Sequence, residues 1–278
     1  MASSDATSAL QAIDGSIVLA GAGKMGGALL TGWIAQGLDP AHVAVIEPHP
    51  SDEIRALAAK GVRLNPASGD IGAVAALVVA VKPQMFQEAA ATLRKWVQPS
   101  TLVVSIMAGT TIAALSAACG GSVVRAMPNT PAAIGRGITV AVADGKVGAQ
   151  QRAMAHALLA ATGTVEWIDD EALMDAVTAV SGSGPAYVFL LAEELARAGV
   201  AAGLPADLAA KLARETVAGS GELLHRSELD AATLRQNVTS PGGTTAAALE
   251  VLMAKDGMQS LMIRAIAAAT RRSKELAK

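Results

Sequence analysis

Residues 16–26 read SIVLAGAGKMG. A short β-prone run ends at Ala20, and three glycines follow it at the spacing GxGxxG. This pattern is typical of the strand, turn and helix that open a dinucleotide-binding βαβ unit. The first glycine permits the tight turn, the second lets the backbone approach a pyrophosphate, and the third allows close contact between helix and strand. The residues that we expect to contact the cofactor here are Gly21, Gly23, Lys24, Met25 and Gly26.

Downstream of this unit, short β-branched runs alternate with amphipathic or alanine-rich stretches as far as residue 168. The alternation predicts a parallel sheet with crossover helices, and the nearly all-apolar strands indicate that both faces of the sheet are covered. We expect strands at 16–20, 43–46, 77–81, 102–106, 123–127 and 138–141, and helices at 27–36, 51–60, 85–96 and 112–118. A last helix and strand are expected within 150–168.

After Asp169 the strand signals stop, and apolar residues recur at helical spacing over 171–195, 206–224 and 245–276. We therefore predict an α/β chain with a disordered tail over 1–12, a Rossmann-type doubly wound sheet over 13–168 and an all-helical domain over 169–278. The helical part has more apolar surface than its own small core needs. We expect a second copy of the chain to bury that surface, although packing on the sheet is the alternative.

The composition excludes several classes of function. The formal net charge is −2 and aromatic residues are 2% of the chain, so we expect no nucleic-acid partner. Cys119 is the single cysteine and no Cys/His cluster has metal-ligand spacing, so we expect neither a disulfide nor a metal site. No basic leader is evident, and the apolar runs fall short of the roughly 20 residues that a membrane helix needs. We therefore expect no membrane partner and a cytoplasmic protein.

Glu47 ends the second predicted strand, about twenty residues beyond the glycine loop. An acid at this position hydrogen-bonds the adenosine ribose of NAD and repels the 2′-phosphate of NADP. His49 or Arg55 turned toward a phosphate would favour NADP instead, and a plain solvated residue at a strand end is a third reading. Glu47 thus favours NAD without excluding NADP.

Polar and rigid residues follow three later strands, where open α/β sheets bind their ligands. Pro83 fixes the chain after one strand and Lys82 is within reach of the cofactor ribose. Residues 105–109 end the next strand. Asn129 and Thr130 lie between Pro128 and Pro131, directly after the strand expected at 123–127, which suggests a nicotinamide pocket.

The helical part contributes two motifs, SGSGPAY at 181–187 and VTSPGGTT at 238–245. Ser181 and Ser183 are explained equally well as helix caps or as ligand contacts. In the second motif, two glycines after a proline precede hydroxyl residues at a predicted helix start. This arrangement makes a nest of N–H donors suited to a carboxylate.

Taken in order, GAGKMG, AVKPQ, MPNTP, SGSGPAY and VTSPGGTT resemble the motifs of the pyrroline-5-carboxylate reductases over essentially the whole chain beyond its tail. The resemblance implies reduction of 1-pyrroline-5-carboxylate to L-proline by NADPH or NADH, and a helical domain that interlocks dimers, often in a ring of dimers. By motif it implies cofactor contacts from Gly21 to Gly26 and from Ala80, Val81, Lys82, Pro83, Ala108 and Gly109. It also implies substrate contacts from Ser240, Gly243, Thr244 and Thr245, with Thr245 and Ser240 as catalytic residues.

The sequence departs from the family pattern at two places. Relatives often carry an adenosine-contacting Asn, for which the nearest residues here are Asn65 and Ser68. Glu47 stands where many relatives carry small or basic residues, so the usual NADP preference is in doubt. A β-hydroxyacid dehydrogenase and a non-catalytic dinucleotide sensor are the alternatives. The former needs a helix-borne lysine that is missing after Pro185, and the latter has no use for VTSPGGTT.

Overall fold

The computed structural model describes residues 10–276. Within these residues the chain forms two compact units, one made of 10–182 with 270–276 and the other of 183–269. Leu10 is fully buried in the core of the first unit, so the expected tail over 1–12 is wrong at its end, and residues 1–9 lie outside the described residues. Among the described residues, no helix is long and apolar enough to cross a membrane.

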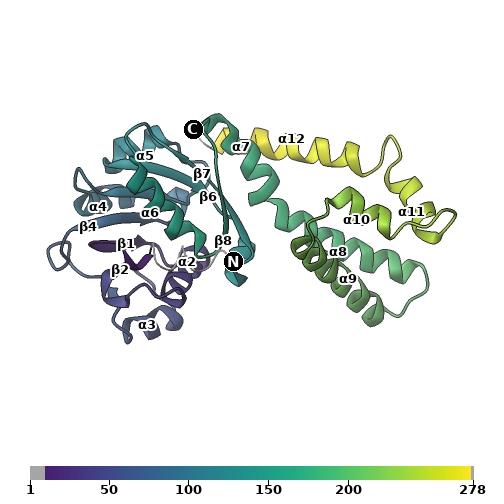
Figure 1. Ribbon diagram of the computed structural model, residues 1–278, viewed down its shortest axis with the longest axis horizontal. Coiled ribbons are helices and arrows are strands. Elements are labelled where there is room, and N and C mark those ends of the chain that lie inside the picture. The colour runs from purple at the N-terminus through teal and green to yellow at the C-terminus, as the bar shows by residue number, and fades with distance from the viewer. Residues whose placement is uncertain (1–9, 277–278) are drawn as a thin grey trace. The chain divides into compact units, whose positions relative to one another are not determined.

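The first unit contains one sheet of eight strands in the order β3-β2-β1-β4-β5-β6-β7-β8, which is the strand order of a doubly wound dinucleotide-binding fold with two further strands (Figure 1). Neighbouring strands run parallel except β6 and β7. The strands are β1 (Ser16–Ala20), β2 (Val43–Ile46), β3 (Arg63–Leu64), β4 (Val74–Val79), β5 (Leu102–Ser105), β6 (Ser122–Met127), β7 (Gly137–Ala143) and β8 (Gly163–Trp167).

The sheet differs from the expected one at β3 and β7. The two-residue strand β3 was not predicted, because its length gives no periodic signal. The pair β6 and β7 is antiparallel, which corrects the expectation of a wholly parallel sheet. Only the 3-10 turn η4 (Thr130–Ile134) joins these two strands, and a parallel crossover needs a dozen or more residues.

Helices cover both faces of the sheet. Alternate strand residues point to opposite faces, so Ile17 and Leu19 pack with α2 and α6 whereas Val18 and Ala20 pack with α4 and α5. The helices of this unit are α2 (Lys24–Ala35), α3 (Asp52–Ala58), α4 (Phe86–Leu93), α5 (Ile112–Cys119), α6 (Ala149–Ala160) and α7 (Met174–Val177). The other short turns are η1 (Pro40–His42), η2 (Pro83–Met85), η3 (Arg94–Trp96) and η5 (Glu171–Leu173).

The sheet unit continues past the expected boundary at residue 168. Glu171 accepts a hydrogen bond from the Ile112 N–H and forms a 2.8 Å ion pair with Arg125, whose side chain is 5% exposed. Met174 is buried against strand β7. The first segment of this unit ends with the π-helical turn η6 (Thr178–Gly182). In its second segment, Ser273 donates a 2.6 Å hydrogen bond to Asp175. These contacts attach residues 170–182 and 270–276 to the sheet.

The second unit is wholly helical. Its helices are α8 (Gly184–Ala201), α9 (Ala206–Arg226), α10 (Ala231–Asn237), α11 (Thr244–Leu252) and most of α12 (Met258–Leu276). Gly199 lets α8 approach α9, because a Cβ there would lie 3.1 Å from the Ala209 Cβ. Many large apolar side chains of this unit are exposed, Phe189 by 67% and Ile263 by 63% among them. Exposed apolar surface of this extent is typical of a face that binds another protein surface.

Trp33 joins α2 to the end of α6, and this contact leads to a test of the fold. The fully buried indole donates a 2.7 Å hydrogen bond to the carbonyl of Leu158, which lies in the last turn of α6, where carbonyls lack intrahelical partners. Trp33→Phe should lower the free energy of unfolding by about 2–4 kcal/mol, since it loses both volume and the bond. Chemical denaturation followed by circular dichroism measures the loss.

Trp96→Phe is the matched control. Trp96 is 4% exposed and shows no indole hydrogen bond among the described residues, so its replacement removes volume alone. Equal losses of stability in the two variants would show that the bond to Leu158 contributes nothing.

Candidate active site

The glycine loop has the tight geometry that its sequence predicts. Gly21 adopts a φ of +89° and donates a hydrogen bond to the carbonyl of Ile46. A Cβ at Gly26 would lie 2.1 Å from the Gly21 carbonyl oxygen, so only glycine fits there. A Cβ at Gly23 would meet no atom within 4 Å, so the space over this residue is open. Backbone atoms therefore crowd the loop at Gly21 and Gly26, whereas the space over Gly23 is free for a ligand.

Helix α2 starts directly from this loop. Gly23 is its N-cap and no side chain caps the helix, so the first N–H groups, beginning at Lys24 and Met25, are left for a ligand. The positive end of the helix dipole adds to this preference for an anion. The start of α2 therefore offers free N–H donors to an anion such as a phosphate.

Residues after β4 and β5 lie at the same edge of the sheet as the glycine loop. A Cβ at Gly21 would lie 2.7 Å from the Ala80 carbonyl oxygen and 2.9 Å from the Val81 nitrogen. Lys82 precedes η2, which begins at Pro83. The Ile106 N–H donates to the Val79 carbonyl, so the segment leading to Ala108 and Gly109 leaves β5 next to β4. The structure thus brings Ala80 and Val81 against the loop, with Lys82 and Pro83 following them and 108–109 following the adjacent strand.

Asn129 has a structural task. Its Oδ1 accepts a 3.0 Å hydrogen bond from the Ile138 N–H, which ties the end of β6 to the start of β7. Thr130 is exposed and begins η4. This part of the expected nicotinamide pocket therefore also serves to hold the β6–β7 connection.

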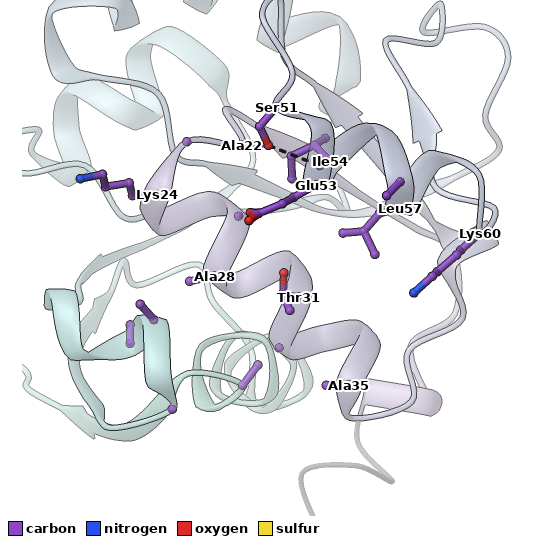
Figure 2. Close-up of a pocket in the computed structure, with 18 residues that line it drawn as sticks. Ala22, Lys24, Ala28, Thr31, Ala35, Ser51, Glu53, Ile54, Leu57 and Lys60 are labelled. Atoms are coloured by element: carbon purple, nitrogen blue, oxygen red, sulfur yellow. Dashed lines mark hydrogen bonds between the residues drawn. The ribbon is translucent and has the colours of Figure 1, made fainter.

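A hollow lies between α2, α3 and η4, on the outer side of the glycine loop (Figure 2). Its lining includes Gly23 and Lys24 at one end, and most of its other residues are small. Figure 2 shows Glu53 directed from α3 toward α2, and Lys24 directed away from α3. The hollow therefore borders the glycine loop on the side of α2 and α3, and neither Glu47 nor residues 80–83 line it.

Glu47 is half-buried and tied to the glycine loop by its carboxylate. Its Oε2 accepts a 2.9 Å hydrogen bond from the Ala22 N–H, and its Oε1 accepts a 3.0 Å hydrogen bond from the His49 N–H. Two main-chain donors therefore hold the negative charge at the end of β2, beside the loop. A carboxylate has about four acceptor positions, so further hydrogen-bonding capacity remains on both oxygens.

Asn65 is a possible equivalent of the family's adenosine-contacting Asn, and in this structure its side chain bonds the main chain of Glu47. Its Oδ1 accepts a 2.8 Å hydrogen bond from the Glu47 N–H, and its Nδ2 donates a 2.9 Å hydrogen bond to the Glu47 carbonyl. It has a φ of +49°, unusual for a residue other than glycine. The family's adenosine-contacting Asn is the one sequence signal that pointed to this residue, and it did not indicate a contact with Glu47.

The helical unit carries the second candidate group, at the VTSPGGTT motif. Ser240 to Gly243 form a type II turn, in which Gly242 has a φ of +70° and the Gly243 N–H donates to the Ser240 carbonyl. A Cβ at Gly243 would lie 2.6 Å from the Ser240 Oγ, so a side chain at this position would displace the hydroxyl. The turn brings the Ser240 side chain to the start of α11.

The start of α11 is open to an anion. Gly243 is the N-cap without a side-chain cap, so the first N–H groups, at Thr244 and Thr245, have no partner within the helix. The hydroxyl of Thr239 is already used, since it donates to the Arg235 carbonyl. Three hydroxyls, those of Ser240, Thr244 and Thr245, remain around these amides.

Two other groups deserve no catalytic assignment from their surroundings. Burial raises the pKa of the Cys119 thiol, which keeps it protonated and unreactive at neutral pH. Ser181 lies in η6, and its Oγ is buried without a hydrogen-bond partner among the described residues. No group of three or more metal-ligating side chains occurs in residues 10–276.

Comparison with known proteins covers both units. A family model described as pyrroline-5-carboxylate reductase dimerisation matches residues 171–276, and one described as NADP oxidoreductase coenzyme F420-dependent matches residues 16–109. The chain is 41% identical over 266 residues to a pyrroline-5-carboxylate reductase of Pseudomonas aeruginosa, covering 94% of this chain and 96% of that protein. A Synechocystis protein of the same name is 42% identical over 261 residues, covering 93% and 97%.

Solved structures agree. A pyrroline-5-carboxylate reductase from Coxiella burnetii superposes with a TM-score of 0.87 at 33% identity, covering 95% of this chain and 99% of that one. A Plasmodium falciparum pyrroline carboxylate reductase with NADP bound superposes with a TM-score of 0.76 at 29% identity, covering 95% and 99%.

Proposed function

The chain belongs to the pyrroline-5-carboxylate reductase family, and from this membership we propose how its own residues carry out the reaction. It is an NAD(P)H-dependent reductase that converts 1-pyrroline-5-carboxylate to L-proline, the final step of proline biosynthesis. The observation that carries the assignment of residues is the presence of one candidate anion site in each unit: an open glycine loop in the sheet unit and an uncapped, hydroxyl-rich helix start in the helical unit.

The residues of the sheet unit fit a nicotinamide dinucleotide. The open space over Gly23 admits a pyrophosphate, and the uncapped start of α2 supplies N–H donors to it. Residues 80–83 and 108–109 border the bound cofactor at the carboxyl edge of β4 and β5, with Asn129 and Thr130 farther along this edge. When bound, the reduced nicotinamide supplies the hydride that the reaction consumes.

The helical unit holds the substrate carboxylate. The amides of Gly243, Thr244 and Thr245 surround the N-terminus of α11, where a negative charge is stabilised by the helix dipole. Gly243 already donates to Ser240, so Thr244 and Thr245 provide the free amides and Ser240 provides a hydroxyl. This division leaves the Thr245 side chain to contact the ring nitrogen.

The substrate's chemistry explains why these modest groups suffice. A carbonyl reductase must protonate an alkoxide, and it positions a general acid such as Lys, His or Tyr to do so. A cyclic imine binds already protonated, so its carbon accepts the hydride while the C=N electron pair passes to the nitrogen that holds the proton. Positioning and exclusion of water then supply most of the rate, and a helix-borne lysine is unnecessary. The β-hydroxyacid dehydrogenase alternative would require a lysine in α8, and α8 contains no lysine.

The assignment is tested by a direct assay. Purified protein given 1-pyrroline-5-carboxylate should oxidise NADH or NADPH, with loss of absorbance at the nicotinamide band and stoichiometric formation of proline. Absence of turnover with either cofactor, in protein shown to be folded by circular dichroism, would refute it.

Glu47 makes NADH the preferred cofactor in this proposal. Its charge repels a 2′-phosphate, and its oxygens occupy the Ala22 and His49 N–H groups that would otherwise be available to that phosphate. Glu47→Ser should raise kcat/KM for NADPH relative to NADH by about tenfold, which is about 1.4 kcal/mol of discrimination. Initial rates with each cofactor measure the ratio.

Glu53→Ser is the matched control for this experiment. It removes the same charge from neighbouring helix α3, where Glu53 is exposed and lines the hollow. A ratio that shifts as much in Glu53→Ser as in Glu47→Ser would mean that general electrostatics, and not the position of Glu47, sets the preference.

The chain associates with itself through its helical unit, as the match to the family's dimerisation model indicates. We extend this to a homodimer, with a ring of dimers as the larger form, because the apolar side chains of α8 and α12 are exposed in the single chain. We also propose a cytoplasmic location, because a reducing compartment suits a protein whose single cysteine is free and buried.

A further inference from the structure

The side chain of Asn65 forms hydrogen bonds with both the N–H and the carbonyl of Glu47. The side-chain carboxamide of Asn65 accepts from the Glu47 N–H and donates to the Glu47 carbonyl, at 2.8 and 2.9 Å. The Asn65 N–H in turn donates to the carbonyl of Val45, at 2.8 Å. Asn65 thus continues the pairing of β2 with β3 by one residue, with a side chain in place of a strand.

This contact controls where the Glu47 carboxylate is held. Glu47 lies one residue beyond β2, where no ladder hydrogen bond of the sheet fixes its backbone. With its N–H and carbonyl held by Asn65, the side chain reaches the Ala22 and His49 N–H groups. Without that restraint, the backbone of Glu47 turns more freely and the carboxylate leaves these donors.

The residue type is matched to the position. A φ of +49° is tolerated by Asn far better than by most other residues with a side chain. Asn presents a neutral donor and an acceptor on one short carboxamide, whereas Asp accepts only and Gly has no side chain.

We propose that Asn65 is a positioning residue for cofactor choice: by clamping the main chain of Glu47, it keeps the carboxylate over the Ala22 and His49 amides and so excludes the 2′-phosphate of NADPH. This inference rests on the role proposed for Glu47. Release of the clamp frees both amides for a phosphate and lets the negative charge move away.

The test measures the dissociation constants of NADH and NADPH by fluorescence titration, without substrate. Asn65→Gly keeps the positive φ and removes both bonds, so the protein should fold. The ratio of the NADPH constant to the NADH constant should fall by about fivefold, within the range expected for one or two exposed hydrogen bonds. Ala67→Gly, at an exposed position in the same loop, is the control and should leave the ratio unchanged.

A double-mutant cycle separates positioning from direct contact. If Asn65 acts through Glu47, adding Asn65→Gly to Glu47→Ser should produce no further change in the ratio. Hydrogen exchange of the free protein should also show faster exchange at the Glu47 amide in Asn65→Gly than in Ala67→Gly, independently of any cofactor.

The outcomes are distinct. A ratio that moves in Glu47→Ser but not in Asn65→Gly overturns the inference and leaves the role of Glu47 standing. Effects that multiply in the double variant also overturn it, since they indicate that Asn65 contacts the cofactor itself. A ratio unmoved in Glu47→Ser refutes the proposed role of Glu47, and the Asn65 inference with it.

Discussion

Gly23→Ala should fold as the unaltered protein does and bind its dinucleotide about 30-fold more weakly. A Cβ at this position meets no protein atom within 4 Å, so the substitution costs the free fold no steric clash. The same Cβ occupies the open space that the pyrophosphate needs in order to approach the backbone. A 30-fold loss corresponds to about 2 kcal/mol of binding energy. Titration of nicotinamide fluorescence gives the dissociation constant, and thermal melting reports the fold.

Gly72→Ala provides the comparison, since Gly72 is exposed and a Cβ there is equally free of contacts. It should change neither binding nor melting temperature. Gly26→Ala is the opposite case, because its Cβ would overlap the Gly21 carbonyl oxygen and damage the loop itself. Unchanged dinucleotide affinity in Gly23→Ala would place the pyrophosphate elsewhere than over this loop.

Thr245→Ala should lower kcat by about 100-fold while the dissociation constant of the cofactor changes less than twofold. The hydroxyl is the group proposed to hydrogen-bond the ring nitrogen, and loss of one well-placed donor at a reacting centre typically has an effect of this size. Alanine is a better helix former than threonine, so α11 remains intact. Steady-state rates at saturating imine, with cofactor titrations, separate the two quantities.

Thr245→Ser keeps the hydroxyl and should retain most of the activity. Equal kcat values for the alanine and serine variants would show that the methyl group or the helix, and not the hydroxyl, is what the reaction needs. Unchanged turnover in both would remove Thr245 from the site.

The sheet was the easiest part to predict from the sequence. The bounds expected for β1 and β2 coincide with those observed, because each is an apolar run that ends at a glycine or an acid. The helical spacing over 245–276 corresponds to two helices, α11 and α12, separated by residues 253–257. At Gly257 a Cβ would lie 2.4 Å from the Leu252 carbonyl oxygen, a close approach that apolar periodicity does not register.

The candidate site was predictable in its residue types and less so in its connections. The glycine spacing predicted the tight loop before α2, and Pro-Gly-Gly predicted the turn before α11, since both depend on backbone conformations that few residues adopt. That Asn65 holds Glu47, or that Asn129 holds Ile138, depends on contacts between segments distant in sequence. A single sequence carries no measure of such contacts.

The path of α12 affects how this protein can be recombined. The helix starts in the helical unit, and from Thr270 onward it belongs to the sheet unit, where Ser273 is bonded to Asp175. In the order of the chain, the helical unit is therefore an insertion within the sheet unit and not an appendage at its end. A chimera that exchanges this unit between relatives needs two crossover points, one near residue 183 and one near residue 270. A single crossover would join the C-terminal turn of one parent to the sheet of the other.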